Sequence, residues 1–314
     1  MTASSGPSPR AAMAARRPAR SHAVFVLCVL VLIVLFLFGI TYRVERSFLI
    51  EARTTGTSIV FAGIGNAWNF PAATLCAPRA VPDLRRAEAG EGPCGADLYV
   101  ITALSDETLD WPDGASVDVH LDSDGAFVIE LLHPIGERPA GTLIVVAPEA
   151  WAIQGALTFR GTLSVGEVMA SGARHFLLDG RWEARESGWA ISLFRGVTEV
   201  VKQGALSLGA EASIIAGDGP AIMYGHLTPS GAGAAMTVTA ISQPGDTALR
   251  LVHFGFEKPS VIRPDWIDTA LASPFLLALV ALLGLLTSVT QVLRDLVFAR
   301  REDAPAAGGG DKAD

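Results

Sequence analysis

Acidic and histidine side chains that could hold a metal ion gather in one short stretch of the sequence. They are Asp118, His120, Asp122 and Asp124, and Gly125 follows them. Oxygen ligands at alternate positions before a glycine are typical of an EF-hand calcium loop, but in that register the first ligand is His120 and the last is Leu131. The match fails, so we expect no metal site. A hairpin turn with solvated acids is the preferred interpretation, and a weak Ca²⁺ contact is the alternative.

The histidines give no further sign of catalysis. Five lie in or beside strand-like runs, without the spacing of metal ligands: His120, His133, His175, His226 and His253. The chain contains no G-x-S-x-G, H-E-x-x-H, Walker or dinucleotide-binding motif. Because a triad can assemble across distance, a hydrolase stays open as an alternative. We expect a protein that is not an enzyme and has no cofactor.

A possible ligand contact surrounds Trp68. Asn66 and Asn69 are the only asparagines of the chain, and they flank this tryptophan. An aromatic face beside amide groups can recognise a sugar ring, since the ring stacks on the sugar and the amides bind its hydroxyls. The alternative is structural: the asparagines form turns and the tryptophan fills a core. A glycan is therefore a possible partner.

Cys76 and Cys94 are predicted to form a disulfide. Cys28 lies inside an apolar run, which leaves these two as the only thiols of the region between the apolar runs. The loop between them is rich in proline, glycine and charge, and closing it contributes about 3 kcal/mol. Zinc is a weaker interpretation because no histidine lies in the loop.

Composition points away from an ordinary cytosolic globule. Half of the residues are hydrophobic, 18% are charged, and the mean hydropathy is +0.39. Residues 43–265 carry 16 basic and 26 acidic side chains, a net charge of −10, whereas the whole chain carries −8. A domain this acidic is a poor partner for phosphates, so we expect no nucleic-acid binding.

Two apolar runs predict transmembrane helices, at 23–42 and 269–293. Residues 23–40 contain no charge and cover about 27 Å as a helix, close to the thickness of the hydrocarbon core. A cleaved signal peptide is the alternative for this run. Arginines flank the end of each run that lies nearer to a chain terminus. The positive-inside rule therefore predicts cytoplasmic termini and an inner-membrane protein with residues 43–265 in the periplasm.

The second apolar run carries a stripe of small and polar residues at helical spacing. They are Ala281, Gly284, Ser288 and Gln291. Such a stripe lets a neighbouring helix approach closely in lipid, which predicts a helix–helix contact with another subunit or a second copy. Ordinary composition of a membrane span is the alternative.

Short apolar runs separated by turn residues predict an antiparallel β-rich, sandwich-like fold from residue 98 onward. An elongated β-roll is the alternative for its second part. The expected organisation is a cytoplasmic tail (1–22), a first span (23–42), a β-rich module with the disulfide (43–147), a second β-rich module (148–265), a second span (269–293) and a cytoplasmic tail (294–314).

Together these features favour a non-enzymatic structural or assembly subunit of a bacterial cell-envelope complex. Its expected partners are the lipid bilayer and other membrane subunits. The alternatives are a membrane-anchored glycan-binding module, a subunit of a two-span channel and a membrane-tethered hydrolase.

Overall fold

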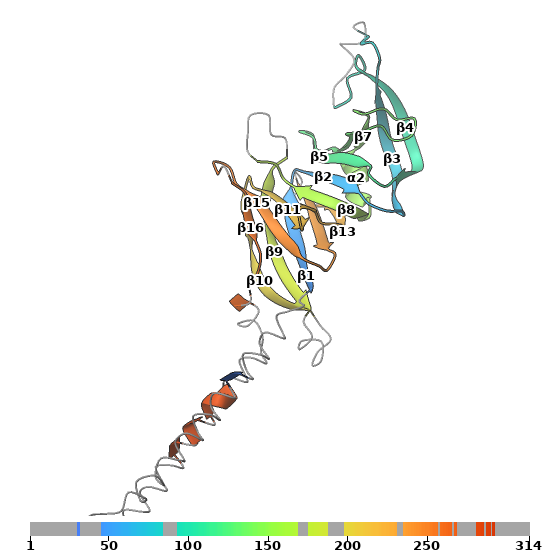
Figure 1. The fold of residues 1–314 in the computed structure, drawn as a ribbon. Helices are drawn as coiled ribbons and strands as arrows, with labels where there is room; N and C mark the ends of the chain where they lie inside the picture. The colour runs from blue at the N-terminus through green and yellow to red at the C-terminus, as the bar shows by residue number, and fades with distance from the viewer. Residues whose placement is uncertain are drawn as a thin grey trace, which may run out of the picture. The chain divides into compact units, whose positions relative to one another are not determined.

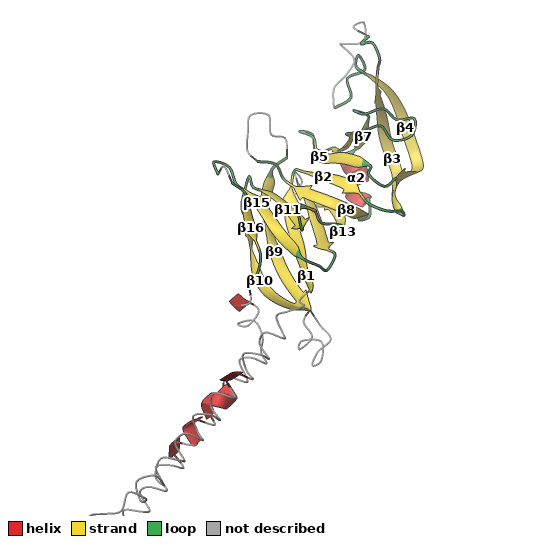
Figure 2. Ribbon diagram, viewed as in Figure 1, coloured by secondary structure: helices red, strands yellow, loops and turns green. Residues whose placement is uncertain are grey.

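The computed structural model describes most of the chain between residues 45 and 265 and short pieces outside it. The described residues are 30–31, 45–83, 93–168, 175–187, 198–230, 235–256, 258–265, 267–268, 281–285, 287–289 and 291–292. The chain divides into two compact units, Met1–Arg263 and Pro264–Asp314. The described strands all belong to the first unit (Figures 1 and 2).

The first unit is built almost entirely of β-strands. They are β1 (Glu45–Thr54), β2 (Gly56–Phe61), β3 (Asn66–Pro78), β4 (Tyr99–Trp111), β5 (Ser116–Leu121), β6 (Phe127–Leu131), β7 (Leu143–Val146), β8 (Leu157–Val165), β9 (Leu177–Ser187), β10 (Glu199–Leu206), β11 (Glu211–Ala216), β12 (Gly219–Pro220), β13 (Met223–Pro229), β14 (Met236–Ser242), β15 (Thr247–Val252) and β16 (Ser260–Ile262). One short helix, α2 (Pro148–Ile153), separates β7 from β8, and its Trp151 ring stacks on Phe127 at 4.0 Å.

Antiparallel pairing joins these strands into one connected sheet. Its order is β10-β9-β1-β14-β13-β8-β2-β5-β6-β7-β3-β4, and β11, with β12, β15 and β16, branches from β8. Alternation of apolar and polar residues explains the strands: along β1, Phe48, Ile50 and Ala52 are buried, while the residues between them are partly exposed. The prediction of an antiparallel β-rich fold is confirmed.

Gly161 marks the point at which β8 changes partner. The first half of β8 pairs with β13 and the second half with β2, and Gly161 belongs to both ladders. A Cβ atom at this position would lie 2.2 Å from the backbone oxygen of Val60, so only glycine allows the strands to approach this closely.

The predicted boundary between residues 147 and 148 falls between β7 and α2. Three strand pairs cross it, β2–β8, β1–β9 and β1–β14. The residues of both predicted modules therefore belong to one connected sheet. The division into two modules stays a prediction.

The prediction of two transmembrane helices is wrong. In the part of the chain that the structure describes, no helix is long and apolar enough to cross a bilayer. Most of 23–42 and 269–293, and both predicted cytoplasmic tails, lie outside the described residues. An apolar run supplies only the composition of a span, which also requires about 20 consecutive helical residues.

The predicted inner-membrane localisation is also wrong, because it depended on the two predicted spans. The Cys76–Cys94 disulfide points instead to an oxidising, extracytoplasmic compartment.

Candidate metal centre

The sheet brings Asp118 and His120 to one face of β5. Residues two apart on a strand point to the same side, and both are partly buried. In the ladder with β2, Asp118 lies opposite Ser58 and His120 lies opposite Gly56. The neighbouring strand therefore offers a hydroxyl beside the carboxylate and no side chain beside the imidazole.

The space above Gly56 is filled by the imidazole of His175. A Cβ atom on Gly56 would lie 2.4 Å from Cγ of His175. The glycine is thus needed for close approach rather than for an unusual backbone angle, and any larger residue would displace the histidine ring.

Backbone hydrogen bonds fix the segment that carries His175. Glu167 N donates to the His175 carbonyl at 2.7 Å, and Thr55 N donates to the Phe176 carbonyl at 3.0 Å. Phe176 N donates to Thr55 Oγ1 at 2.7 Å, and Thr54 Oγ1 donates to the Phe176 carbonyl at 3.0 Å. His175 is therefore held in place at the junction of β1 and β2, and the site is preorganised.

The three side chains form a compact cluster. His175 Nε2 lies 3.0 Å from Asp118 Oδ2, and the rings of His120 and His175 stack with their centroids 5.5 Å apart and a 20° angle between planes. Each residue can direct one ligand atom so that all three lie within 4.8 Å of one another. The side chains of His175 and Asp118 are only 8% and 15% exposed.

The carboxylate of Asp118 is kept in its charged form. Burial raises its pKa, but the hydrogen bonds from His175 and Ser58 and the nearby histidine charges outweigh burial and lower the pKa below its ordinary value. Ser58 Oγ donates to Asp118 Oδ1 at 2.9 Å, which leaves Oδ2 directed at His175.

Two imidazoles and one carboxylate are a donor set for a borderline transition metal such as Zn²⁺. Ligand atoms bound to zinc at about 2.0–2.2 Å in a tetrahedron lie roughly 3.3–3.5 Å apart. The present atoms lie within 4.8 Å of one another, so a side-chain movement of about 1 Å would close the site. Ser58 would orient the ligating carboxylate, as outer-shell partners of metal sites do.

The same residues do not form a hydrolytic triad. In a triad the serine hydroxyl bonds the imidazole, which takes its proton. Here Ser58 bonds the carboxylate of Asp118, so His175 is not placed to activate it.

A shallow groove of about 410 Å³ shares no residue with the cluster: it is lined by Arg181, Trp182, Glu183, Gln203, Gly204 and Ala205.

This cluster could not be recognised from sequence spacing because its third ligand atom comes from a distant segment. Asp118 and His120 supply two of its three ligand atoms, and the carboxylates of Asp122 and Asp124 are not part of it. These belong to the turn between β5 and β6, where Asp122 N donates to the Ala126 carbonyl and Gly125 has φ 79°. The hairpin turn is as predicted. His175, whose spacing from these residues carries no signal, completes a set of side chains that could hold a metal ion, and the expectation of no metal site stays a prediction.

The predicted ligand contact at Trp68 lies in the core. Trp68 is 1% exposed, and its Nε1 donates to the Thr158 carbonyl at 2.7 Å. Asn66 is buried and accepts a hydrogen bond from Arg160 N, whereas Asn69 is exposed and accepts one from Thr108. The tryptophan therefore offers no face to a sugar and fills a core, as in the structural interpretation, whereas both asparagines lie in β3 and not in turns.

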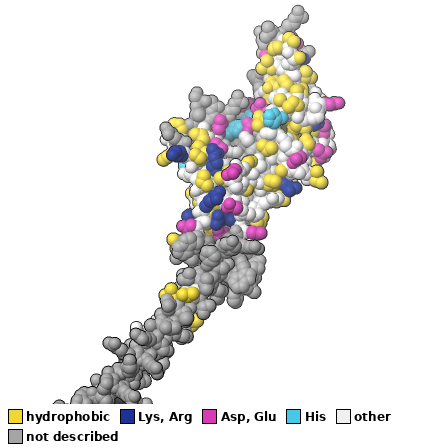
Figure 3. Space-filling model, viewed as in Figure 1, with side chains coloured by type: hydrophobic (Ala, Val, Ile, Leu, Met, Phe, Trp, Pro, Cys, Tyr) yellow, Lys and Arg dark blue, Asp and Glu magenta, His cyan; other side chains and the backbone are white. Residues whose placement is uncertain are grey.

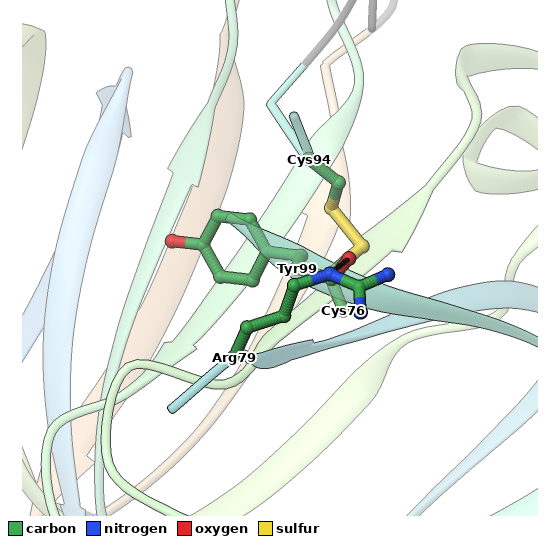
Figure 4. Close-up of a disulfide and its surroundings, with 4 residues drawn as sticks. All are labelled: Cys76, Arg79, Cys94 and Tyr99. Carbon is green, nitrogen blue, oxygen red and sulfur yellow. Dashed lines mark hydrogen bonds between the residues drawn. A yellow bond between two sulfur atoms is a disulfide. The ribbon is translucent and has the colours of Figure 1, made fainter. Parts of the chain in front are cut away.

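The predicted disulfide is confirmed. Cys76 on β3 and Cys94 are bonded, with their Cα atoms 6.0 Å apart (Figure 4). Arg79 lies beside the bridge, and its Nε donates to the carbonyls of Ala96 and Tyr99. The bridge and this arginine tie the end of β3 to the start of β4.

The four residues of the predicted helix contact are helical and exposed: Ala281, Gly284, Ser288 and Gln291. They belong to the unit Pro264–Asp314, whose contacts with other chains stay a prediction. Thr287 Oγ1 donates to the Gly284 carbonyl at 2.8 Å within this segment.

Comparison with known proteins adds no relative: no family model, curated protein or solved structure matches the chain. The geometry of the cluster is therefore the evidence on which a function can be argued.

Proposed function

We propose that this chain is a non-enzymatic β-sheet protein of an oxidising, extracytoplasmic compartment whose fold is stabilised by a Zn²⁺ ion bound to Asp118, His120 and His175. The observation that carries the proposal is the convergence of these three ligand atoms within 4.8 Å. The proposal keeps the non-enzymatic, structural character of the sequence-based hypothesis and none of its membrane partners.

The ion would act as a link between two distant parts of the chain. Asp118 and His120 belong to β5, and His175 precedes β9. An ion that binds the folded chain and not the unfolded chain stabilises it by about 2.7 kcal/mol when its free concentration is 100 times its Kd. For a unit of this size, that corresponds to a rise in Tm of about 5–10 °C.

Thermal unfolding of the purified full chain tests the proposal. The protein is stripped with a chelator and unfolded with and without Zn²⁺, with Mg²⁺ as a hard-cation control that imidazoles bind poorly. We expect Zn²⁺ alone to raise Tm, and equilibrium dialysis to give one tightly bound ion per chain.

Matched histidine variants locate the ion. His175→Ala and Asp118→Ala are expected to lose the Zn²⁺-dependent rise in Tm. His226→Ala removes a partly buried strand histidine outside the cluster and should keep it. An unchanged rise in His175→Ala, or no rise in the wild-type chain, would contradict the proposal.

A further inference from the structure

The outer edge of β4 is the longest strand edge that the described sheet leaves open. β4 ends the strand order and pairs with β3 alone among the described strands. The other ends carry the features by which natural sheets avoid edge pairing. β16 has only three residues, and β10 has a register shift between Val200 and Lys202.

One half of this edge is uncharged and apolar. Tyr99–Leu104 contains no charged residue, and Val100 and Ile101 are 45% and 49% exposed. Figure 3 shows hydrophobic side chains gathered over the β3–β4 hairpin. The other half carries three acids, Asp106, Glu107 and Asp110, in a domain that is already strongly acidic. Edge pairing is therefore favourable in the first half and opposed by charge in the second.

The ladder with β3 shows which backbone groups face outward. Arg79 N donates to the Leu98 carbonyl, so Leu98 directs its backbone groups toward the β3 side. Direction alternates along a strand, and Ile101 and Ala103 therefore direct their N–H and C=O groups to the outer edge. These groups provide two donors and two acceptors on each copy of the chain.

We infer that Tyr99–Leu104 pairs antiparallel with the same segment of a second copy of this chain, about a two-fold axis at Thr102. In this register Ile101 of each copy faces Ala103 of the other, which forms four backbone hydrogen bonds. Asp106 faces Leu98, and the first pair of like charges, Asp97 with Glu107, lies outside the paired segment. The edge of a second copy matches this one in length, charge and alternation.

The disulfide prepares this segment for pairing. Cys76 lies opposite Ile101 in the β3–β4 ladder and is bonded to Cys94, so the hairpin is braced where the partner would bind. A strand that is already ordered loses less conformational freedom on association.

A cysteine on the two-fold axis tests the register directly. Thr102 forms a non-hydrogen-bonded pair with its own copy, with Cα atoms about 4.5 Å apart, which a disulfide can span. In full-length chain carrying Cys28→Ser, we expect Thr102→Cys to form disulfide-linked dimers on mild oxidation. Thr108→Cys, on the same strand but outside the segment, should stay unlinked. Absence of linkage at Thr102, or equal linkage at both positions, would overturn the inference.

Sedimentation of the unlinked protein tests whether this edge holds the dimer. Ile101→Lys places a charge beside its equivalent across the axis and should raise the dimer Kd at least tenfold, whereas Thr108→Lys should leave it unchanged. A wild-type chain that is monomeric at about 100 µM, or a dimer that Ile101→Lys does not weaken, would contradict the inference.

Discussion

Two clusters of side chains share strand β2 but differ in the hydrogen-bonding groups that they leave free to bind a ligand. The aromatic cluster comprises Phe61, Trp68 and Trp111, whose ring centroids are 5.1–5.3 Å apart. The polar cluster comprises Asp118, His120 and His175. β2 contributes to both, through Phe61 to the first and through Gly56 and Ser58 to the second.

The difference lies in their hydrogen bonding. The indole of Trp68 has one donor, and the Thr158 carbonyl accepts from it, so the group has no further capacity. The charged carboxylate and the imidazole nitrogens of the polar cluster can bind a cation without moving far. The first cluster should therefore govern stability alone, and the second should govern ion binding.

The largest expected effect comes from the aromatic cluster. Trp68→Ala removes a fully buried ring and leaves a cavity, and we expect it to lower the free energy of unfolding by about 3–5 kcal/mol. Urea unfolding of the metal-free protein measures the loss. Zinc affinity of the remaining folded protein should be unchanged. A loss below about 1 kcal/mol would show that this core is not what holds the region together.

The disulfide should also affect stability without affecting the ion. The double variant Cys76→Ser, Cys94→Ser is expected to lower the free energy of unfolding by about 3 kcal/mol, because the unfolded chain gains freedom. Urea unfolding with and without Zn²⁺ separates the two contributions. The increment due to Zn²⁺ should be the same in both proteins, and its loss would connect the bridge to the metal centre.

Gly56→Ala should affect both properties. The added methyl group overlaps the ring of His175, so we expect zinc affinity to fall roughly 10–100-fold, with a loss of stability of about 1–3 kcal/mol. Titration calorimetry of the folded variant gives the affinity. Gly155→Ala is the control, since no atom lies within 4 Å of its added Cβ. Equal affinities in the two variants would contradict the role assigned to Gly56.

Ser58→Ala is expected to have the smallest effect. It removes the hydroxyl that orients Asp118, and loss of such an outer-shell partner lowers metal affinity by about tenfold. Ser58→Thr keeps the hydroxyl on a strand that accepts β-branched residues, so it should restore most of the affinity. If the two variants bind Zn²⁺ equally, the hydrogen bond does not orient the ligand.

Local patterns predicted the parts of the fold that depend on neighbouring residues. Alternation of Val117 and Val119 with polar residues indicated β5, and Asp122–Gly125 indicated the turn that follows it. The disulfide followed from a simple count, because two thiols remained between the apolar runs. The individual strands before residue 98 were not predicted within the β-rich module expected at 43–147, partly because Pro71, a residue that disfavours strands, lies inside β3.

The candidate metal centre could not be predicted, because the approach of its residues depends on strand register. Gly56 lies opposite His120 only in the β2–β5 ladder, and His175 reaches this glycine from a segment with no pattern of its own. Trp68 was predicted as a ligand contact but is buried, since residue type alone does not show which face of a strand is covered. The apolar runs predicted spans from hydropathy alone, and no helix of the described residues is long and apolar enough to cross a bilayer.

Anomalous diffraction from crystals grown with Zn²⁺ tests the central claim most directly. We predict a zinc peak bonded to Asp118, His120 and His175, with metal–ligand distances of about 2.0–2.2 Å, and no such peak in crystals of His175→Ala. A wild-type map with no peak at these residues, or with zinc bound only elsewhere, would contradict the assignment and leave the cluster as a buried ion pair.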